Sequence, residues 1–88
     1  IACLNSLATS NLNITYLKMY VNGSMVAMAE DDFRSNPGVK NVPSVITIQN
    51  LSATDYVEVY AKIDTSDSGA ARIDGDDYQQ MFGGFKIG

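Results

Sequence analysis

A chain of 88 residues is long enough for one domain, but it buries only about 60–65% of its unfolded surface and so has a small core. The single cysteine and the absence of histidine exclude an internal disulfide framework and a zinc site. The net charge is −4 and the six basic residues are scattered, so nucleic acid is not an expected partner. No apolar stretch approaches the roughly 18 residues of a membrane helix, so membrane insertion is not expected either.

The chain opens on an apolar run, Ile1-Ala2-Cys3-Leu4, which is typical of the interior of a strand. Since a domain rarely starts in mid-strand, residues 1–88 are predicted to form a single domain at the C-terminal end of a longer chain. Earlier residues or other chains are then expected to supply part of the stability. Within the run, Cys3 is predicted to be a small buried side chain rather than a reactive thiol.

The strongest turn signal is Asn22-Gly23, which lies between two strand-like segments, residues 16–21 and 24–28. An Asn-Gly pair can take positive φ at both positions, as a type I′ turn requires. A β-hairpin is therefore predicted around this turn.

The next segments are a loop and a strand. Residues 30–43 show no periodicity and contain the turn Asn36-Pro37-Gly38, so they are predicted to form a surface loop. Residues 44–49 are rich in β-branched side chains and are predicted to form a strand.

The clearest strand is predicted over residues 55–63, where apolar and polar side chains alternate. One face carries Val57, Val59, Ala61 and Ile63, and the other carries Tyr56, Glu58, Tyr60 and Lys62. Two tyrosines therefore flank Glu58 on the outward face, as Tyr16 and Tyr20 flank Lys18 earlier in the chain. Outward aromatic rings are typical of interfaces, although scattered surface aromatics are also ordinary.

The C-terminal third is predicted to hold a polar loop at residues 64–69, a short strand at 70–74 and a turn at 75–77. The last strand is predicted from about residue 79 to residue 87, and Gly83-Gly84 within it indicates a bulge or a close backbone approach. No window shows an apolar period of 3.6 residues. Six or seven short strands with loops between them indicate an all-β protein, an antiparallel β-sandwich or barrel.

Three motifs in this order resemble the globular-head domains of complement proteins. Residues 17–23 are similar to the family's "LY-x-NG" hairpin, residues 52–60 to its "L-x-x-G-D-x-V-x-V" strand, and residues 82–87 to its C-terminal "F-S-G-F-L-I" strand. The resemblance covers about residues 14–88. The sequence departs from it at Thr54, where the family usually has glycine, at Gly83, which replaces the serine, and at Lys86, which breaks an apolar position.

The resemblance implies a ten-stranded jelly roll of the complement and tumour-necrosis-factor superfamily, whose first strands this chain lacks. It implies a homotrimer in which the strand with Tyr56, Glu58 and Tyr60 packs around a threefold axis with the strand that holds Phe82 and Phe85. Pattern alone allows Lys18 and Glu58 to meet on adjacent strands. The resemblance instead puts these two strands in opposite sheets, and we follow it for Tyr56 and Tyr60.

The sequence offers few candidate catalytic, metal-binding or modification sites. No nucleophile has a base at a recognisable spacing, so no catalytic residue is assigned and no enzyme is expected. Five aspartates, Asp64, Asp67, Asp74, Asp76 and Asp77, could hold calcium, but they are more typical of solvated acidic turns, and neither a metal site nor a cofactor is predicted. Asn13, Asn22 and Asn50 begin glycosylation triplets, which such sequences also produce by chance.

The usage of alanine, methionine and asparagine differs from that of vertebrate members of the resembling family. Divergent copies of the fold occur at the ends of fibres on bacteriophages and other viruses, so the resemblance implies such a setting. The expected function is that of a structural and binding module of a virion fibre or appendage. Such a module would trimerise and present the loops at residues 30–43 and 64–78 to a host receptor or a neighbouring virion protein. The alternative is a secreted cellular ligand or lectin-like head, so the expected location is the virion surface or the extracellular space. A third possibility is an enzyme whose active residues precede Ile1.

Overall fold

The computed structural model describes residues 1–4, 6–8, 11–66, 70–73 and 80–87. Within these residues the protein is all-β, as predicted, and has no helix. Its strands are β1 (Ala2–Cys3), β2 (Ser6–Ala8), β3 (Leu12–Val21), β4 (Ser24–Asp32), β5 (Lys40–Asn41), β6 (Ser44–Val45), β7 (Val57–Thr65), β8 (Ala71–Ile73) and β9 (Met81–Phe82).

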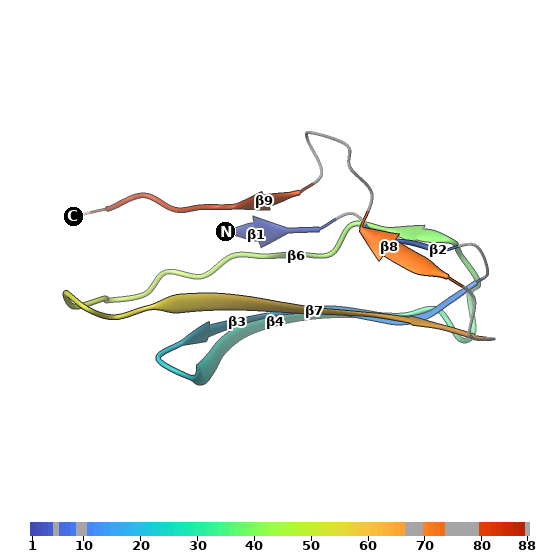
Figure 1. Cartoon of the computed structure of the whole chain (residues 1–88), viewed down its shortest axis with the longest axis horizontal. Coiled ribbons are helices and arrows are strands. Elements are labelled where there is room, and N and C mark those ends of the chain that lie inside the picture. The colour runs from blue at the N-terminus through green and yellow to red at the C-terminus, as the bar shows by residue number, and fades with distance from the viewer. Residues whose placement is uncertain (5, 9–10, 67–69, 74–79, 88) are drawn as a thin grey trace.

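The strands form three antiparallel three-stranded sheets in the orders β4-β3-β7, β6-β1-β9 and β5-β2-β8. We call the first the long sheet. The two short sheets share one register, because Cys3 lies opposite Ser44 and Ser6 lies opposite Asn41, three residues further along each strand. The N–H of Leu4 donates to the carbonyl of Pro43 between them, at 3.1 Å. We therefore treat these two sheets as one layer, the short-strand layer, which lies above the long sheet in Figure 1.

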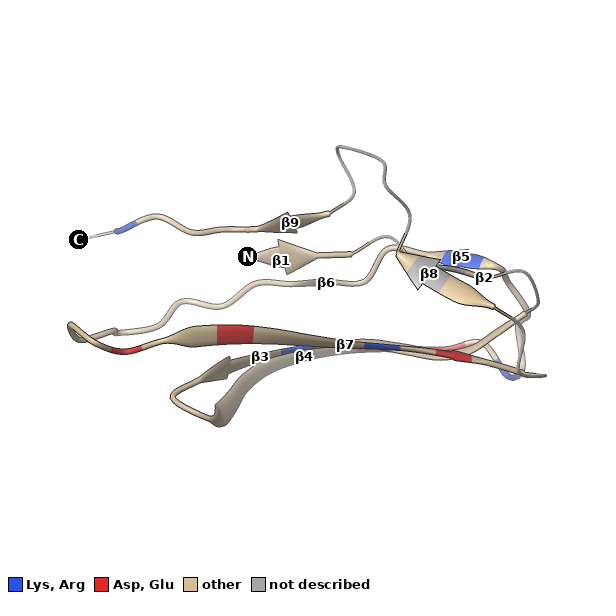
Figure 2. Ribbon diagram, viewed as in Figure 1, with Lys and Arg blue, Asp and Glu red and all other residues tan. Residues whose placement is uncertain are grey.

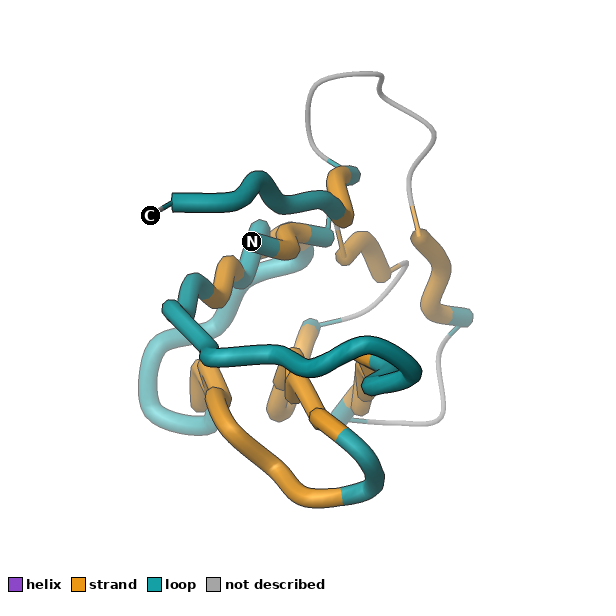
Figure 3. Tube along the Cα trace, turned by 90° about the vertical axis from the view of Figure 1, so that its left-hand side faces the viewer, coloured by secondary structure: helices purple, strands orange, loops and turns teal. Residues whose placement is uncertain are grey.

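The main core cluster lies between the long sheet and the short-strand layer. Ala2 and Val45 of the short strands pack with Leu17 and Met19 of β3, and all of them are buried. The view along the strands in Figure 3 shows the long sheet at the bottom and the C-terminal segment farthest from it. The core is small, as the chain length predicted, and burial of these few apolar side chains is its main stabilising contribution.

The positions of β3 that face the core change from even to odd numbers along the strand. Leu12 is buried, and so are Thr15, Leu17 and Met19, although the parity of the numbering changes between Leu12 and Thr15. The pairing of β3 with β7 shifts register between Leu12 and Ile14, which identifies a bulge. A bulge adds one residue to a strand and reverses which later positions face the core. This extra residue lets one ten-residue strand keep a buried face along its length.

A polar link ties the two layers together at their other end. The side-chain amide of Asn41 in β5 donates to Thr15 Oγ1 at 2.7 Å and to Asp31 Oδ2 at 2.8 Å. Thr15 is fully buried, and this bond satisfies its hydroxyl in the core. The link therefore connects β5 to both β3 and β4.

The predicted hairpin is confirmed. Asn22 and Gly23 have φ of 49° and 82°, and Val21 lies opposite Ser24 on either side of them. These are the positive values that a two-residue hairpin turn demands, and Asn and Gly tolerate them best. The predicted short strand near residue 72 is also present as β8.

Two predicted strands are shorter than expected. Only Ser44–Val45 of residues 44–49 and only Met81–Phe82 of the described part of the last strand are paired. Both flank β1, and Gly83 exchanges hydrogen bonds with Ile1 next to this pairing. Among the described residues, no strand pairs with residues 46–49 or 84–87.

Three further predictions differ from the structure. The surface loop is shorter than residues 30–43, because β4 continues to Asp32 and Lys40–Asn41 forms β5. The strands that carry Lys18 and Glu58 are not in opposite sheets. Strand β3 pairs directly with β7 along its length, as the alternation of side chains alone allowed. Cys3 is half-buried rather than fully buried.

The turn that leads into β7 has an unusual backbone. Thr54 has φ of 76°, in the left-handed region that disfavours a β-branched side chain. The N–H of Asp55 donates to the carbonyl of Ser52 at 3.1 Å and closes the turn. Positive φ at the third residue of a turn is the position that glycine favours. This is the position at which the resembling domains have glycine.

We predict that Thr54→Gly raises the free energy of unfolding by about 1 kcal/mol, because it removes the strain of a left-handed threonine. Urea unfolding followed by circular dichroism measures the change. The matched control is Ala53→Gly, one residue earlier, where φ is not positive and added backbone freedom should lower stability. A Thr54→Gly variant no more stable than the parent would contradict the strain argument.

Candidate functional site

Aromatic and charged side chains gather on the outer face of the long sheet. The register places Tyr16 opposite Lys62, Lys18 opposite Tyr60, and Tyr20 opposite Glu58. Leu17 and Met19 occupy the alternate positions of β3 and face the core, so these side chains face away from it. We define the tyrosine face as the outer positions of β3 and β7 with Tyr56: Tyr16, Lys18, Tyr20, Tyr56, Glu58, Tyr60 and Lys62.

The alternation predicted for the strand of Glu58 holds for its first residues. Val57 and Val59 pack against the core cluster, while Tyr56 and Tyr60 are 53% and 52% exposed. Ala61, on the face predicted to be inward, is exposed. Rings of this size at half exposure remain available to a partner.

Tyr20 and Tyr60 form the walls of a small depression at one end of the tyrosine face. Their ring centroids are 5.2 Å apart and their planes are 80° apart, an edge-to-face pair. The hydroxyl of Tyr60 donates to Glu58 Oε2 at 2.9 Å. The depression has a volume of about 270 Å³, opens to solvent, and is lined by Tyr20, Gly23, Glu58 and Tyr60.

The carboxylate of Glu58 controls the electrostatics of this depression. Its hydrogen bond to the Tyr60 hydroxyl, followed by its negative charge, raises the pKa of Tyr60 above the ordinary phenol value. Tyr60 is therefore a neutral donor over the physiological pH range. Among the described residues, Glu58 forms no ion pair.

The other end of the face carries the cations. Lys18 Nζ lies 4.4 Å from the centroid of the Tyr16 ring, a cation–π contact, and Lys62 lies opposite Tyr16. Charge is therefore divided along the face, with cations beside Tyr16 and the carboxylate between Tyr20 and Tyr60.

The hairpin turn and the turn before β7 are bonded to each other beside the depression. Asn22 Nδ2 donates to Asp55 Oδ1 at 2.9 Å, and Asn22 Oδ1 accepts from the N–H of Tyr56 at 3.1 Å. Asp55 Oδ2 also accepts from the N–H of Ser52 at 2.7 Å. Asn22 therefore fixes the backbone of Tyr56 as well as its own turn. Sequence analysis missed this role, since the Asn-Gly pair is sufficiently explained by φ.

These bonds to Asp55 lower the pKa of its carboxyl group, the Asn22 bond first and the Ser52 bond second. Ionised Asp55 is thus the form that joins the two turns.

The structure does not bring together the five residues predicted at the trimer interface. Tyr56, Glu58 and Tyr60 lie on the tyrosine face, whereas Phe82 and Phe85 belong to the short-strand layer. Phe82 pairs with Ala2, and Phe85 is 87% exposed beyond the end of β9.

A second exposed surface lies at the end of the short-strand layer, where residues 46–50 and 83–87 extend past Ile1 in the same direction (Figure 1). Five large apolar side chains are exposed there, and we call them the apolar end: Ile1, Ile46, Ile48, Phe85 and Ile87. Ile46 and Ile48 are 73% and 78% exposed. The strand predicted over residues 44–49 did not anticipate this exposure, since pairing with a neighbouring strand would have covered part of it.

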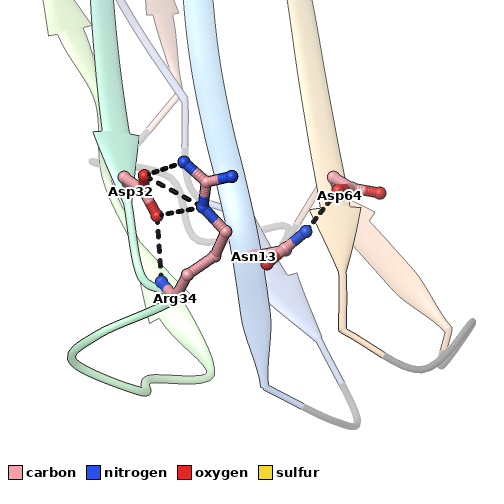
Figure 4. A network of polar contacts seen from close by, with 4 residues as sticks. All are labelled: Asn13, Asp32, Arg34 and Asp64. Atoms are coloured by element: carbon pink, nitrogen blue, oxygen red, sulfur yellow. Dashed lines mark hydrogen bonds and ion pairs between the residues drawn. The ribbon is translucent and has the colours of Figure 1, made fainter.

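The loop at residues 33–39 and the base of the long sheet carry polar contacts, shown in Figure 4. Arg34 Nε donates to both oxygens of Asp32, at 2.9 and 3.0 Å, and these bonds lower the pKa of Asp32 to about 2. Asn13 Nδ2 donates to Asp64 Oδ2 at 2.9 Å. Asp64 is the one member of the predicted acidic cluster that the structure describes, since residues 67, 74, 76 and 77 lie outside the described part.

No cluster of three or more potential metal ligands occurs among the described residues. The same part of the chain contains no helix of the length and apolarity needed to cross a membrane. In comparisons with known proteins, no family model, no curated sequence and no solved structure matches the chain.

We predict that Asp55→Asn lowers stability at neutral pH but not in acid. A carboxyl group with a lowered folded-state pKa stabilises the fold above its unfolded pKa of about 3.9, and this contribution is lost as the pH falls through the lower folded value. Asn22 and Ser52 donate to different carboxylate oxygens, and asparagine would replace one of these oxygens with an N–H₂ group, which cannot accept. The difference between parent and variant should therefore shrink from pH 6 towards roughly pH 2.

Urea unfolding at several pH values measures this difference. The matched control is Glu30→Gln, an exposed carboxylate that forms no hydrogen bond among the described residues. If the Asp55→Asn difference stayed constant across this pH range, ionised Asp55 would not be the group that joins the turns.

Proposed function

We propose that this chain is an assembly and binding module with a jelly-roll fold that forms a homotrimer, rather than an enzyme. The chain order supports the fold. The chain starts in the short-strand layer, passes to the β3–β4 hairpin of the long sheet, returns to β5 and β6, crosses to β7, and ends in β8 and β9. Such crossing between layers is typical of Greek-key sandwiches.

The edges of the sheets are compatible with this fold. Strands β7 and β9 are outer strands of their sheets, while β6 contacts β3 and β4. The left-handed backbone at Thr54, where the resembling domains have glycine, also favours this family.

The observation that carries the assembly proposal is the apolar end. Ile46, Ile48 and Phe85 are each more than 70% exposed, which is costly in a chain whose core is small. Figure 2 shows no charged residue among residues 44–50, β1 or β9, and Lys86 is the one charged residue in the C-terminal segment.

The absence of acidic residues there favours one kind of occupant. The chain carries a net charge of −4, so two copies repel each other wherever their acidic residues meet. The apolar end is a surface on which copies can meet without this repulsion. We therefore assign it to contact with further copies of the chain, and retain Phe85 of the predicted interface. The tyrosine face is then left outward, free to bind a different partner.

The proposed setting is a virion fibre or appendage, with the partner on a host surface or a neighbouring virion protein. A secreted ligand or lectin-like head is the second candidate, and N-glycans would favour it. The side-chain amides of Asn13 and Asn22 both donate hydrogen bonds within the fold, to Asp64 and Asp55. A glycan on either nitrogen would compete with these bonds, and this supports the first candidate.

Light scattering on the intact chain tests the assembly. We expect a mass of about three times the 9.5 kDa of one chain for the parent, and a lower mass for Ile48→Asp and Phe85→Asp, because a buried charge opposes association. The control is Tyr60→Asp, on the tyrosine face, which should keep the parent mass. A monomeric parent would contradict the proposal. Dissociation by Tyr60→Asp alone would show that the interface is the tyrosine face.

A further inference from the structure

We infer that the depression between Tyr20 and Tyr60 is a binding site for an alkylammonium group, either a lysine side chain or a methylated amine of a partner. This inference rests on the proposed binding role of the tyrosine face, but not on the trimer. Ammonium groups are recognised by aromatic rings that present their faces as walls, together with a nearby carboxylate. The depression contains both.

The ring geometry forms a corner. Tyr20 and Tyr60 stand nearly perpendicular, at 80°, with centroids 5.2 Å apart, so together they supply two walls that meet at an angle. Gly23 forms another side and has no side chain to fill the space, and its φ of 82° disfavours any replacement. The Tyr56 hydroxyl lies 4.0 Å from the point where a Cβ on Gly23 would sit. The turn thus leaves the depression open between aromatic groups.

The charges match a cation. Glu58 lines the depression and accepts its one described hydrogen bond from the neutral Tyr60 hydroxyl. That bond leaves the negative charge without a positive partner among the described residues. The net charge of −4 draws cations to the chain and repels anions.

The protein itself demonstrates this chemistry at the other end of the same face. There, the ammonium group of Lys18 lies over the Tyr16 ring at 4.4 Å. In the pairing of β3 with β7, Lys18 lies opposite Tyr60, but its side chain places the ammonium group over Tyr16 instead. The Tyr20–Tyr60 corner is therefore left without a cation of the described residues.

The carboxylate also selects between sources of the ammonium group. A choline headgroup carries a phosphate close to its quaternary nitrogen, and Glu58 together with the net negative charge would repel that phosphate. A lysine or methyl-lysine side chain carries no such anion. We therefore assign the site to a basic peptide segment of the partner.

The test titrates the full chain with choline and with 3,3-dimethylbutan-1-ol, the uncharged molecule of the same shape. Binding is followed by the NMR signals of Tyr20 and Tyr60 and by tyrosine fluorescence, which is usable because the sequence has no tryptophan. We expect millimolar binding of choline and at least roughly tenfold weaker binding of the alcohol. Equal binding of the two would overturn the inference, since it would show that shape alone is recognised.

Variants then identify the groups responsible. Tyr60→Leu and Glu58→Gln should each weaken choline binding about three- to tenfold, whereas Tyr60→Phe, which keeps the ring, should retain most of it. The control Tyr16→Leu removes a tyrosine from the other end of the face and should leave choline binding unchanged. Loss of binding in Tyr16→Leu, with the NMR dispersion of the fold intact, would place the site elsewhere.

A last comparison separates the two sources. Acetyl-trimethyllysine amide should bind at least as tightly as choline, and phosphocholine should bind more weakly than either. Tighter binding of phosphocholine would overturn the assignment to a basic peptide. Light scattering on the same samples tests the trimer separately. A monomer that binds choline would contradict the trimer alone, and a trimer that does not bind choline would contradict the cation site alone.

Discussion

The pairing of β3 with neighbours on both of its edges is the constraint on which the rest of the structure depends. Strand β3 lies between β4 and β7, and its alternate side chains enter two different environments. Leu17 and Met19 meet Ala2 and Val45 in the core, while Tyr16, Lys18 and Tyr20 face outward. Since the side-chain period of a strand is two, a slip by one residue would exchange the core with the tyrosine face. Core and candidate site are therefore fixed by the same register.

Two local devices hold that register. At one end, the Asn22-Gly23 turn sets the alignment of the hairpin as far as the register shift between Met19 and Tyr20. Asn22 also bonds the turn to Asp55 and to the backbone of Tyr56. At the other end, the bulge near Asn13 and the bond from Asn13 to Asp64 fix β3 against β7. The two asparagines thus act at opposite ends of the same pair of strands. The tyrosine face lies between these two fixed ends, and a surface held in place loses less entropy when a partner binds.

Sequence patterns predicted the local structure of this chain far better than its pairings. The Asn-Gly turn and the alternation at Val57 and Val59 were sufficient to predict the hairpin and the facing of β7, because both are determined within a few residues. Which strand lies next to β7 depends on contacts distant in sequence, and there the resemblance misled while the outward tyrosine pattern was the better guide. Strand propensity also failed at Ile46 and Ile48, since a β-branched run pairs only where a neighbour is present.

The candidate site shows the same division. Sequence analysis singled out Tyr56, Glu58 and Tyr60 by their alternation, and Tyr16, Lys18 and Tyr20 by theirs, but could not join the two sets. The Tyr20–Tyr60 corner exists because Tyr20 lies opposite Glu58 and Lys18 lies opposite Tyr60. Thr54 was visible as a departure from the resembling motif, whereas its positive φ is a property of the folded turn. Patterns within a strand are readable in sequence, and properties of a strand pair are not.

The two exposed surfaces differ in the physics they can use. The apolar end, with Ile48 and Phe85, gains free energy from burial in proportion to its area and carries little directional information. It suits a permanent contact between identical copies. The tyrosine face carries hydroxyls, a carboxylate and ammonium groups. Tyrosine side chains tolerate both solvent and a protein partner, because each has an apolar ring and a polar hydroxyl. It suits recognition of a separate partner, since specificity comes from placed polar groups and rigid rings rather than from apolar area. In the proposed assembly, the first surface adds stability to a chain with a small core, and the second surface stays free for binding.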